Sequence, residues 1–145
     1  TGRGKLGMLV PLLGAWVAEA DSPMGRVRCT RQFERVLGGT YVELRAHWRF
    51  ARKEYEERAL FGLDRERKLA VWSFTSDGKQ STGQRLDVSD LNARAVGFES
   101  LMPAGRARQA YWPVGDDGVQ WVVEVAGRRG WKRMVTHLYR RVEEA

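Results

Sequence analysis

The chain has 145 residues, of which 43% are hydrophobic and 30% charged, a composition typical of a folded globular domain and not of a disordered segment. Six Trp, five Phe and four Tyr supply enough large apolar surface for a sizeable core. Cys29 is the only cysteine, which excludes an intrachain disulfide and a zinc site built from several cysteines. We expect residues 1–145 to form one domain.

The formal net charge is +7, and only five of the 25 basic residues are lysines. Such an excess of arginine raises the question of a nucleic-acid partner. The arginines are, however, interleaved with acidic residues, as in Glu43-Leu44-Arg45, and this alternation is typical of cross-strand ion pairs on a solvated sheet face. The densest basic cluster, within residues 128–133, is typical of a loop tip. We therefore expect no nucleic-acid partner.

The N-terminal residues have the layout of a secretory signal. A basic segment precedes an apolar run over residues 6–18, and Ala18-Glu19-Ala20 resembles a signal-peptidase site. Pro11 and two glycines interrupt the run, which favours a short helical turn over residues 6–12 and a strand from Gly14. Because no run is long enough to span a membrane, we expect a cytoplasmic protein without a membrane partner.

Turn-forming residues recur along the chain and divide it into ten extended segments. Gly supplies positive φ at such turns, and Asp and Asn cap them with their own side chains. Asp77-Gly78 is the sharpest hairpin signal. The nine breaks fall at residues 21–25, 38–39, 51–53, 64–67, 77–78, 89–92, 103–105, 115–118 and 127–130.

Several segments alternate between apolar and polar residues, which is the pattern of a strand with one buried face. The clearest cases are residues 41–50 and 119–126. In the first, one face carries Val42, Leu44, Ala46, Trp48 and Phe50, and in the second Val119, Trp121, Val123 and Val125. These segments are also rich in Val and aromatic residues, as strands prefer.

The links between segments are short, and no helical segment of ten or more residues follows the first strand. Parallel βαβ units are therefore excluded, since they need a crossover helix, and an antiparallel meander is favoured. Closure would remove the two exposed edges of a ten-stranded sheet. The sequence predicts an all-β fold: an up-and-down barrel of about ten strands with a short N-terminal helical turn. A two-sheet sandwich is the alternative.

A short motif, Leu13-Gly14-Ala15-Trp16, begins the first expected strand. A Gly-x-Trp after a helical turn resembles the opening of the calycins, the superfamily of lipocalins and fatty-acid-binding proteins. The resemblance implies that Trp16 plugs the closed end of the barrel and that an arginine late in the chain packs over it. Arg140 and Arg141 are the candidates, and we assign this role to Arg140.

Residues 33–43 and 72–78 resemble an uncharacterised bacterial family of lipocalin-like barrels. That family is similar to nitrobindins, ten-stranded barrels that hold haem near one mouth. Two features depart from other calycins. Only residues 21–25 separate the first two strands, which leaves no room for the helical lid of fatty-acid-binding proteins, and the chain cannot form the disulfides of secreted lipocalins.

The first candidate site is an apolar pocket inside the barrel. A barrel of ten strands has room for a ligand unless large side chains fill it, and apolar walls with few polar groups are usual for small-molecule sites. We expect a small hydrophobic or amphipathic ligand; the alternative is a filled barrel that acts through its surface or as a homodimer. The side chains expected to line the pocket are Trp48, Phe50, Trp72, Phe74, Phe98 and Trp121.

Polar residues of the last segment supply two further candidates. Tyr139 and Arg141 share a strand face and would hold a carboxylate by charge-assisted hydrogen bonds; fatty-acid-binding proteins use a similar pair in the opposite order. By resemblance to nitrobindins, His137 is a candidate axial ligand of haem b. Alternation groups His137 with Trp131, Arg133, Val135, Tyr139 and Arg141, but it does not decide which face points inward. The ligand hypothesis itself requires no cofactor.

No catalytic signature indicates an enzyme. Cys29 would need a neighbouring base to act as a nucleophile, and no motif places either histidine, His47 or His137, beside it. Acid–base pairs are defined by geometry and shifted pKa values, and no spacing selects one here. The titratable residues without such a signal are Glu99, Glu124, Tyr111 and Tyr139.

Overall fold

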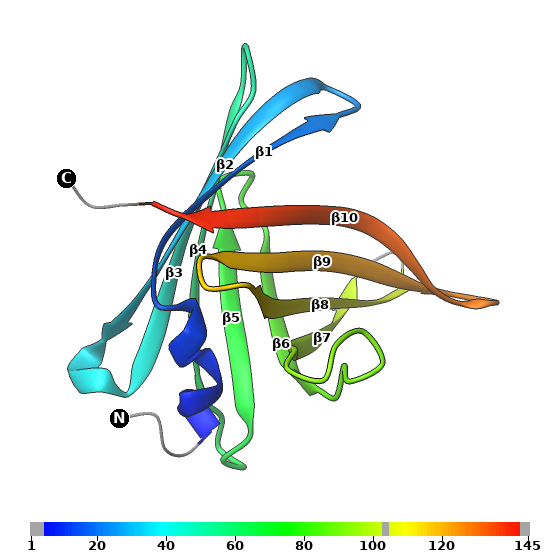
Figure 1. Cartoon of the computed structure of the whole chain (residues 1–145). Helices are drawn as coiled ribbons and strands as arrows, with labels where there is room; N and C mark the ends of the chain where they lie inside the picture. The colour runs from blue at the N-terminus through cyan, green and yellow to red at the C-terminus, as the bar shows by residue number, and fades with distance from the viewer. Residues whose placement is uncertain (1–4, 103–104, 143–145) are drawn as a thin grey trace.

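A computed structural model describes residues 5–102 and 105–142. In this part of the chain ten antiparallel strands pair in sequence order, and β1 pairs with β10 to close a barrel (Figure 1). The predicted up-and-down barrel is confirmed. The strands are β1 (Gly14–Ser22), β2 (Gly25–Val36), β3 (Tyr41–Arg49), β4 (Glu54–Leu63), β5 (Leu69–Thr75), β6 (Gln80–Leu86), β7 (Val96–Met102), β8 (Gly105–Val114), β9 (Gly118–Gly127) and β10 (Gly130–Arg141).

Two 3-10 helices complete the fold, η1 (Lys5–Leu12) before the first strand and η2 (Leu37–Gly39) between β2 and β3. The expected N-terminal helical turn is thus present. Within residues 5–102 and 105–142, neither of these helices approaches the length and apolar character that a membrane span requires.

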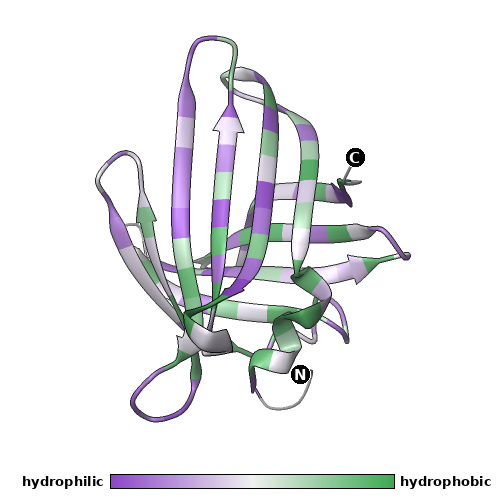
Figure 2. Ribbon diagram, turned by 90° about the vertical axis from the view of Figure 1, so that its left-hand side faces the viewer, coloured by the Kyte–Doolittle hydropathy of each residue, from purple (hydrophilic) through white to green (hydrophobic). Residues whose placement is uncertain are grey.

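Because every strand reverses direction, the connections alternate between the two ends of the barrel. We call the end that holds η1 the closed end; it also carries η2 and the β4–β5, β6–β7 and β8–β9 connections. The opposite end, here the open end, carries the β1–β2, β3–β4, β5–β6 and β9–β10 turns. Alternating bands of hydrophilic and hydrophobic residues along the strands (Figure 2) reflect one inward and one outward side chain in turn.

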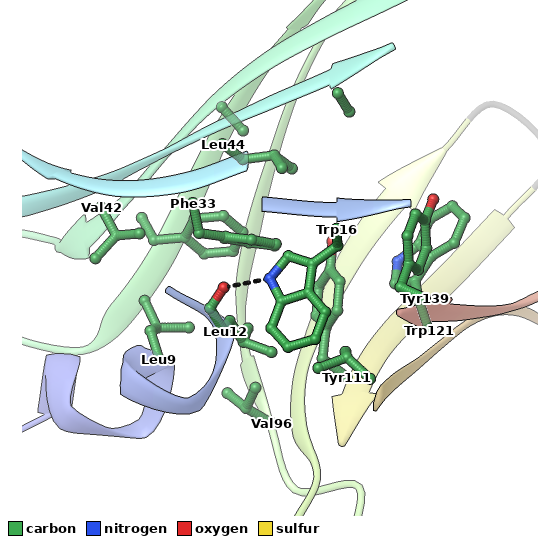
Figure 3. Packing of buried hydrophobic residues seen from close by; sticks show 14 of the residues in the cluster. Leu9, Leu12, Trp16, Phe33, Val42, Leu44, Val96, Tyr111, Trp121 and Tyr139 are labelled. Carbon is green, nitrogen blue, oxygen red and sulfur yellow. Dashed lines mark hydrogen bonds between the residues drawn. The ribbon is translucent and has the colours of Figure 1, made fainter. Parts of the chain in front are cut away.

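Large apolar side chains fill the closed half of the barrel. Leu9 and Leu12 of η1 pack into this end of the barrel, where they contact a core that includes inward-facing rings of the strands (Figure 3). Phe61 lies 5.2 Å from Phe98 and 6.1 Å from Phe33, measured between ring centroids. This half is therefore packed core, and any ligand space must lie toward the open end.

Trp16 closes this core as the Gly-x-Trp motif implies, but the arginine that covers it is Arg141. Trp16 Nε1 donates a hydrogen bond of 2.7 Å to the Leu12 carbonyl (Figure 3). The Arg141 guanidinium lies 4.2 Å from the Trp16 ring and donates to the Leu13 carbonyl. Gly14 has φ +120° and faces this guanidinium, and a Cβ there would lie 2.5 Å from Arg141 Nη1.

The assignment of the covering role to Arg140 is wrong. Register pairs Arg141 with Trp16 and Arg140 with Val17. Because side chains alternate along a strand, Arg140 points to the outer face, where it is exposed. Arg141 therefore contacts Trp16 and Leu13 at the closed end, and it lies at the opposite end of β10 from the open end.

The barrel wall is closed unevenly. Strands β1 and β10 are joined by only two residue pairs, Trp16–Arg141 and Val17–Arg140, whereas β2 pairs with β1 over the whole length of β1. Beyond Val17 the two strands diverge, as Figure 1 shows. A second, smaller divergence separates β6 from β7 beyond the pair Gln84–Glu99. The wall therefore opens as a wedge between β1 and β10.

Candidate functional site: a cleft between β1 and β10

A cleft of about 620 Å³ lies where β1 and β10 diverge. The tip of the β1–β2 hairpin, residues 21–24, forms one side, and residues 134–137 of β10 form the other. Its lining is mostly apolar, with a few polar groups, which is the usual character of a small-molecule site. The barrel is thus filled at its closed end and hollowed at its open end.

Three of the aromatic residues expected in a pocket line this cleft, namely Trp48, Phe50 and Trp121. Trp48 and Trp121 belong to β3 and β9, the two strands whose alternation was clearest in the sequence. Tyr55 of β4 also lines the cleft and packs against Trp48 with ring centroids 5.2 Å apart. The cleft therefore has an aromatic wall from three strands.

The prediction that Trp72 and Phe74 line the interior is wrong. In β5 the buried core residues Leu69 and Val71 take the inward positions, which turns Trp72 and Phe74 outward. Phe74 is 54% exposed, and Trp72 packs on the ring of Tyr41 at 6.5 Å. Both border a polar hollow along the outer wall at the β6–β7 divergence.

Phe98 and Arg141 are also outside the cleft, for different reasons. Phe98 does point inward, as predicted, but its ring is buried in the closed-end core against Phe61. Arg141 covers Trp16 and does not join Tyr139 in a pair. The predicted Tyr139–Arg141 carboxylate anchor is therefore wrong as a pair, although Tyr139 does face the interior.

Tyr139 instead pairs with Arg31 of β2, a residue that was not predicted to be functional. Arg31 is only 2% exposed in the middle of the barrel. Its Nε donates a hydrogen bond to Tyr139 Oη at 3.0 Å, and its Nη1 donates to Tyr111 Oη at 2.8 Å. The remaining nitrogen, Nη2, is buried without a hydrogen-bond partner among the described residues.

Aromatic rings surround this guanidinium on several sides. Its central carbon lies 4.0 Å from the centroid of Trp121 and 5.2 Å from that of Trp48, both of which line the cleft. The rings of Tyr111 and Tyr139 follow at 5.7 and 5.5 Å. Arg31 therefore lies directly behind the aromatic wall of the cleft, where cation–π attraction partly replaces lost hydration.

The electrostatics around Arg31 keep it charged. Burial disfavours the charged guanidinium, but Tyr111, Tyr139 and the Glu57 carboxylate attract it and together raise the pKa of Arg31 above its usual range. Burial likewise raises the pKa of the Tyr111 and Tyr139 hydroxyls, so both stay neutral at pH 7. Glu57 accepts its described hydrogen bond from Ser73 Oγ, and no carboxylate among the described residues hydrogen-bonds Arg31.

His137 lines the cleft on the β10 side. The ladder between β9 and β10 shifts register between Arg133 and Val135, so this bulge changes which side chains point inward. Val135, His137 and Tyr139 consequently face the interior, whereas Arg133 faces outward, where its Nε donates to Glu124. The prediction that Arg133 and His137 share one face of the strand is therefore wrong, because the bulge lies between them.

The environment of His137 favours the neutral imidazole. Burial and the nearby Arg31 charge lower the pKa of His137 below its usual value, and its Nδ1 is buried without a described partner. The Trp121 ring lies 5.5 Å away. Within residues 5–102 and 105–142, no three His, Cys, Asp or Glu side chains cluster as a protein-only metal site would require.

Cys29 lies in the interior beside Tyr139 and is buried. Burial raises the pKa of the Cys29 thiol to about 11, while Arg31 and a hydrogen bond with Tyr139 act in the opposite direction. The thiol is therefore protonated at neutral pH, which is the opposite of what a nucleophilic cysteine needs.

A second buried arginine, Arg108 of β8, lies on the outer face of the barrel and is 5% exposed. It donates to Glu124 at 2.7 and 2.9 Å and to both carboxylate oxygens of Asp90 at 2.9 and 3.2 Å. The Trp131 ring covers it at 4.5 Å. Asp90 belongs to the β6–β7 connection, so this ion-pair network fastens that connection to the wall.

No protein-family model matches this chain, and no curated protein matches it in sequence. Its function is therefore inferred from the geometry and charges of the cleft.

Proposed function

We propose that this protein binds a small amphipathic anion in the cleft between β1 and β10. The acidic head accepts a hydrogen bond from Arg31, and the apolar tail lies along Trp48, Phe50 and Trp121. The observation that carries the proposal is Arg31 Nη2, a charged donor buried behind the cleft wall without a partner among the residues that the structure describes. Buried donors in folded proteins are nearly always satisfied.

Charge makes an anion the favoured ligand. The Arg31 guanidinium is desolvated, and its two described hydrogen bonds go to neutral phenol oxygens. A carboxylate or similar oxyanion would supply the missing acceptor and a directly hydrogen-bonded negative charge, whereas Glu57 attracts Arg31 without a described hydrogen bond to it, and charge-assisted hydrogen bonds are the stronger kind. The aromatic wall adds affinity through burial of the tail.

The test compares two probes with the same tail, dodecanoate and dodecan-1-ol, by quenching of tryptophan fluorescence. We expect tighter binding of dodecanoate, and we expect Arg31→Met to weaken dodecanoate binding by roughly 10- to 100-fold, the worth of one hydrogen bond to a charged group. Dodecan-1-ol binding should change little, which also shows that the variant remains folded.

Arg28→Met is the matched control, because Arg28 lies on the same strand but on the outer face, paired with Glu19. It should bind both probes as the wild type does. Equal binding of acid and alcohol by the wild type would contradict the anion, and failure of both probes to bind would contradict the cleft as a ligand site.

A second candidate function is haem binding, favoured by one observation: His137 is a neutral imidazole in the wall of an apolar cleft. Such an imidazole fits as an axial iron ligand, and His137 would hold the iron while Trp121 flanks the group. A bound haem would supply redox and gas-binding chemistry. Against this fit, no described residue gives His137 Nδ1 the second hydrogen-bond partner that metal-bound histidines usually have.

Titration with haemin tests the second candidate. A Soret band that appears with wild type and with His47→Ala, but not with His137→Ala, would favour haem; His47 lies outside the barrel beside Glu54 and is the matched control. Equal spectra for the two variants would remove haem from consideration and leave the anion proposal intact.

A further inference from the structure

Basic residues without ion-pair partners gather at the turns of the open end. The β3–β4 turn carries Arg52 and Lys53, and the β9–β10 turn carries Arg128 and Arg129, followed by Lys132. All five are exposed, and none forms an ion pair with another described residue. Neither of these turns contains an acidic residue.

The closed end mixes acidic and basic residues in its connections. Its β8–β9 turn contains Asp116 and Asp117, and the β6–β7 connection contains Asp87 and Asp90. The net positive charge of the chain is therefore distributed unevenly along the barrel axis, although the sequence spreads basic residues along its whole length. The closed-end connections also contain Arg65, Arg67 and Arg94, but their acidic residues offset these cations, so the two basic turns of the open end carry the local excess of positive charge.

The most exposed apolar side chains lie mainly toward the open end, although Val10, Val114 and Val142 at the closed end are also 37%, 40% and 42% exposed. Among the described residues, the large apolar side chains exposed by more than half are Met24 at 59%, Leu37 at 67%, Phe74 at 54%, Leu101 at 82% and Met134 at 57%. Only Leu37, in η2, belongs to the closed end. Met24 and Met134 both line the cleft, whose lining also includes Lys53.

We propose that the open end docks on an anionic lipid bilayer, with Arg52, Lys53, Arg128 and Arg129 against the headgroups and Met24 and Met134 dipping into the surface. Clustered cations attract anionic membranes, and stable attachment needs a second, apolar contribution. In Figure 1 the β1–β2 and β9–β10 hairpins extend from the barrel body on either side of the wedge. The absence of a run able to span a bilayer, from which we expected no membrane partner, does not bear on such a surface contact.

Docking in this orientation would place the cleft mouth against the bilayer. This consequence rests on the proposed function, because an amphipathic anion could then pass between membrane and cleft without crossing water. The docking itself does not rest on it. Arg31 lies inside the barrel and contributes nothing to the outer surface.

Co-sedimentation with vesicles tests the docking. One set contains phosphatidylcholine and phosphatidylglycerol in equal parts, and the other phosphatidylcholine alone. We expect binding to the mixed vesicles that weakens with salt, and no comparable binding to the neutral ones. The paired variants Arg52→Gln/Lys53→Gln and Arg128→Gln/Arg129→Gln should each lower the affinity roughly tenfold or more, given the attraction per cation.

The control variant Arg65→Gln/Arg94→Gln removes the same charge from exposed positions at the closed end. It should bind mixed vesicles as the wild type does, and an equal loss would mean that net charge alone is responsible, which overturns the proposal. Met24→Ser/Met134→Ser should weaken binding while keeping its salt dependence. The docking proposal would also be overturned if the protein bound duplex DNA more tightly than vesicles and the same turn variants lost that binding. The surface would then be assigned to nucleic acid.

The two proposals fail separately. Arg31→Met should lose its preference for dodecanoate but keep vesicle binding, and Arg52→Gln/Lys53→Gln should do the reverse. Absence of vesicle binding by a protein that still binds dodecanoate would overturn the docking alone.

Discussion

The two buried arginines of this barrel differ in how their charge is compensated. Arg108, on the outer face, hydrogen-bonds two carboxylates, Glu124 and Asp90, and is covered by a tryptophan. Arg31, in the interior, is also covered by tryptophan, but within residues 5–102 and 105–142 its hydrogen bonds go to two phenols and one nitrogen has no partner. The first guanidinium hydrogen-bonds carboxylates directly, whereas among the described residues the second is attracted by Glu57 without a hydrogen bond to it. Burial alone therefore does not indicate function; an unfilled donor beside a cleft does.

The largest expected effect is a loss of folding stability on substitution of Arg108, which hydrogen-bonds two carboxylates. Arg108→Met would leave Glu124 buried with only Arg133 as a partner, and losing one partner of a buried ion pair typically costs about 3–5 kcal/mol. Urea denaturation should show a loss of this size. Adding Glu124→Gln removes the buried carboxylate that has lost its Arg108 partner, so the double variant should recover part of the lost stability. An Arg108→Met protein as stable as the wild type would mean that this network does not hold the β6–β7 connection.

An effect of intermediate size is expected when a ligand for Arg31 is added: the free energy of unfolding should rise. Dodecanoate at a hundred times its dissociation constant should raise the free energy of unfolding by about 2.7 kcal/mol, because it binds only the folded state. The same concentration of dodecan-1-ol should give a clearly smaller increase. Thermal unfolding with each probe measures the two increases in stability. Equal increases with the acid and the alcohol would contradict the view that Arg31 binds an anion.

Arg31→Met should have a much smaller effect on stability than Arg108→Met. The substitution removes two hydrogen bonds from a charged group, each worth about 1.5 kcal/mol or more, but it also removes the cost of burying a charge whose described hydrogen bonds go only to neutral phenols. We expect a change of about 1 kcal/mol in urea denaturation. A loss as large as that of Arg108→Met would show that Arg31 is mainly structural.

The smallest expected effect is a pH dependence from His137, the titratable neighbour of Arg31 in the cleft wall. Its pKa in the folded state lies below the unfolded value because burial and Arg31 disfavour its charged form. The unfolded state therefore binds more protons, and stability should fall as the pH drops below the unfolded value of about 6.5. His137→Gln should lose this part of the acid sensitivity in denaturation series between neutral and mildly acidic pH. Unchanged acid sensitivity in the variant would contradict the lowered pKa.

The sequence predicts the barrel well because its strands alternate and its turns contain Gly, Asp and Asn at the chain reversals. In β3 and β9 one face is consistently apolar, so the inward positions of Trp48 and Trp121 follow directly. In β5 the residues 69–72 are all apolar, so alternation does not select a face there, and the large rings of Trp72 and Phe74 favour the wrong one. The inward face there is decided by the small and branched residues that pack with neighbouring strands.

Features that depend on register or on distant strands are not visible in a local pattern. The bulge in β10 separates Arg133 from His137, and pairing with Trp16 selects Arg141 over Arg140. Arg31 does leave a trace in the sequence, because it shares its alternation with the apolar residues Val27, Cys29 and Phe33. Its partners Tyr111 and Tyr139, however, come from β8 and β10 and meet it only in the closed barrel.

The most direct measurement is the titration of bound dodecanoate carrying ¹³C in its carboxyl group, followed by NMR. A carboxylate that pairs with Arg31 should remain ionised to a pH well below that at which the free acid protonates, and Arg31→Met should abolish this shift. A bound carboxyl group that titrates like the free acid in the wild type would contradict the account, because the head would then lie in water and Arg31 would have no part in binding.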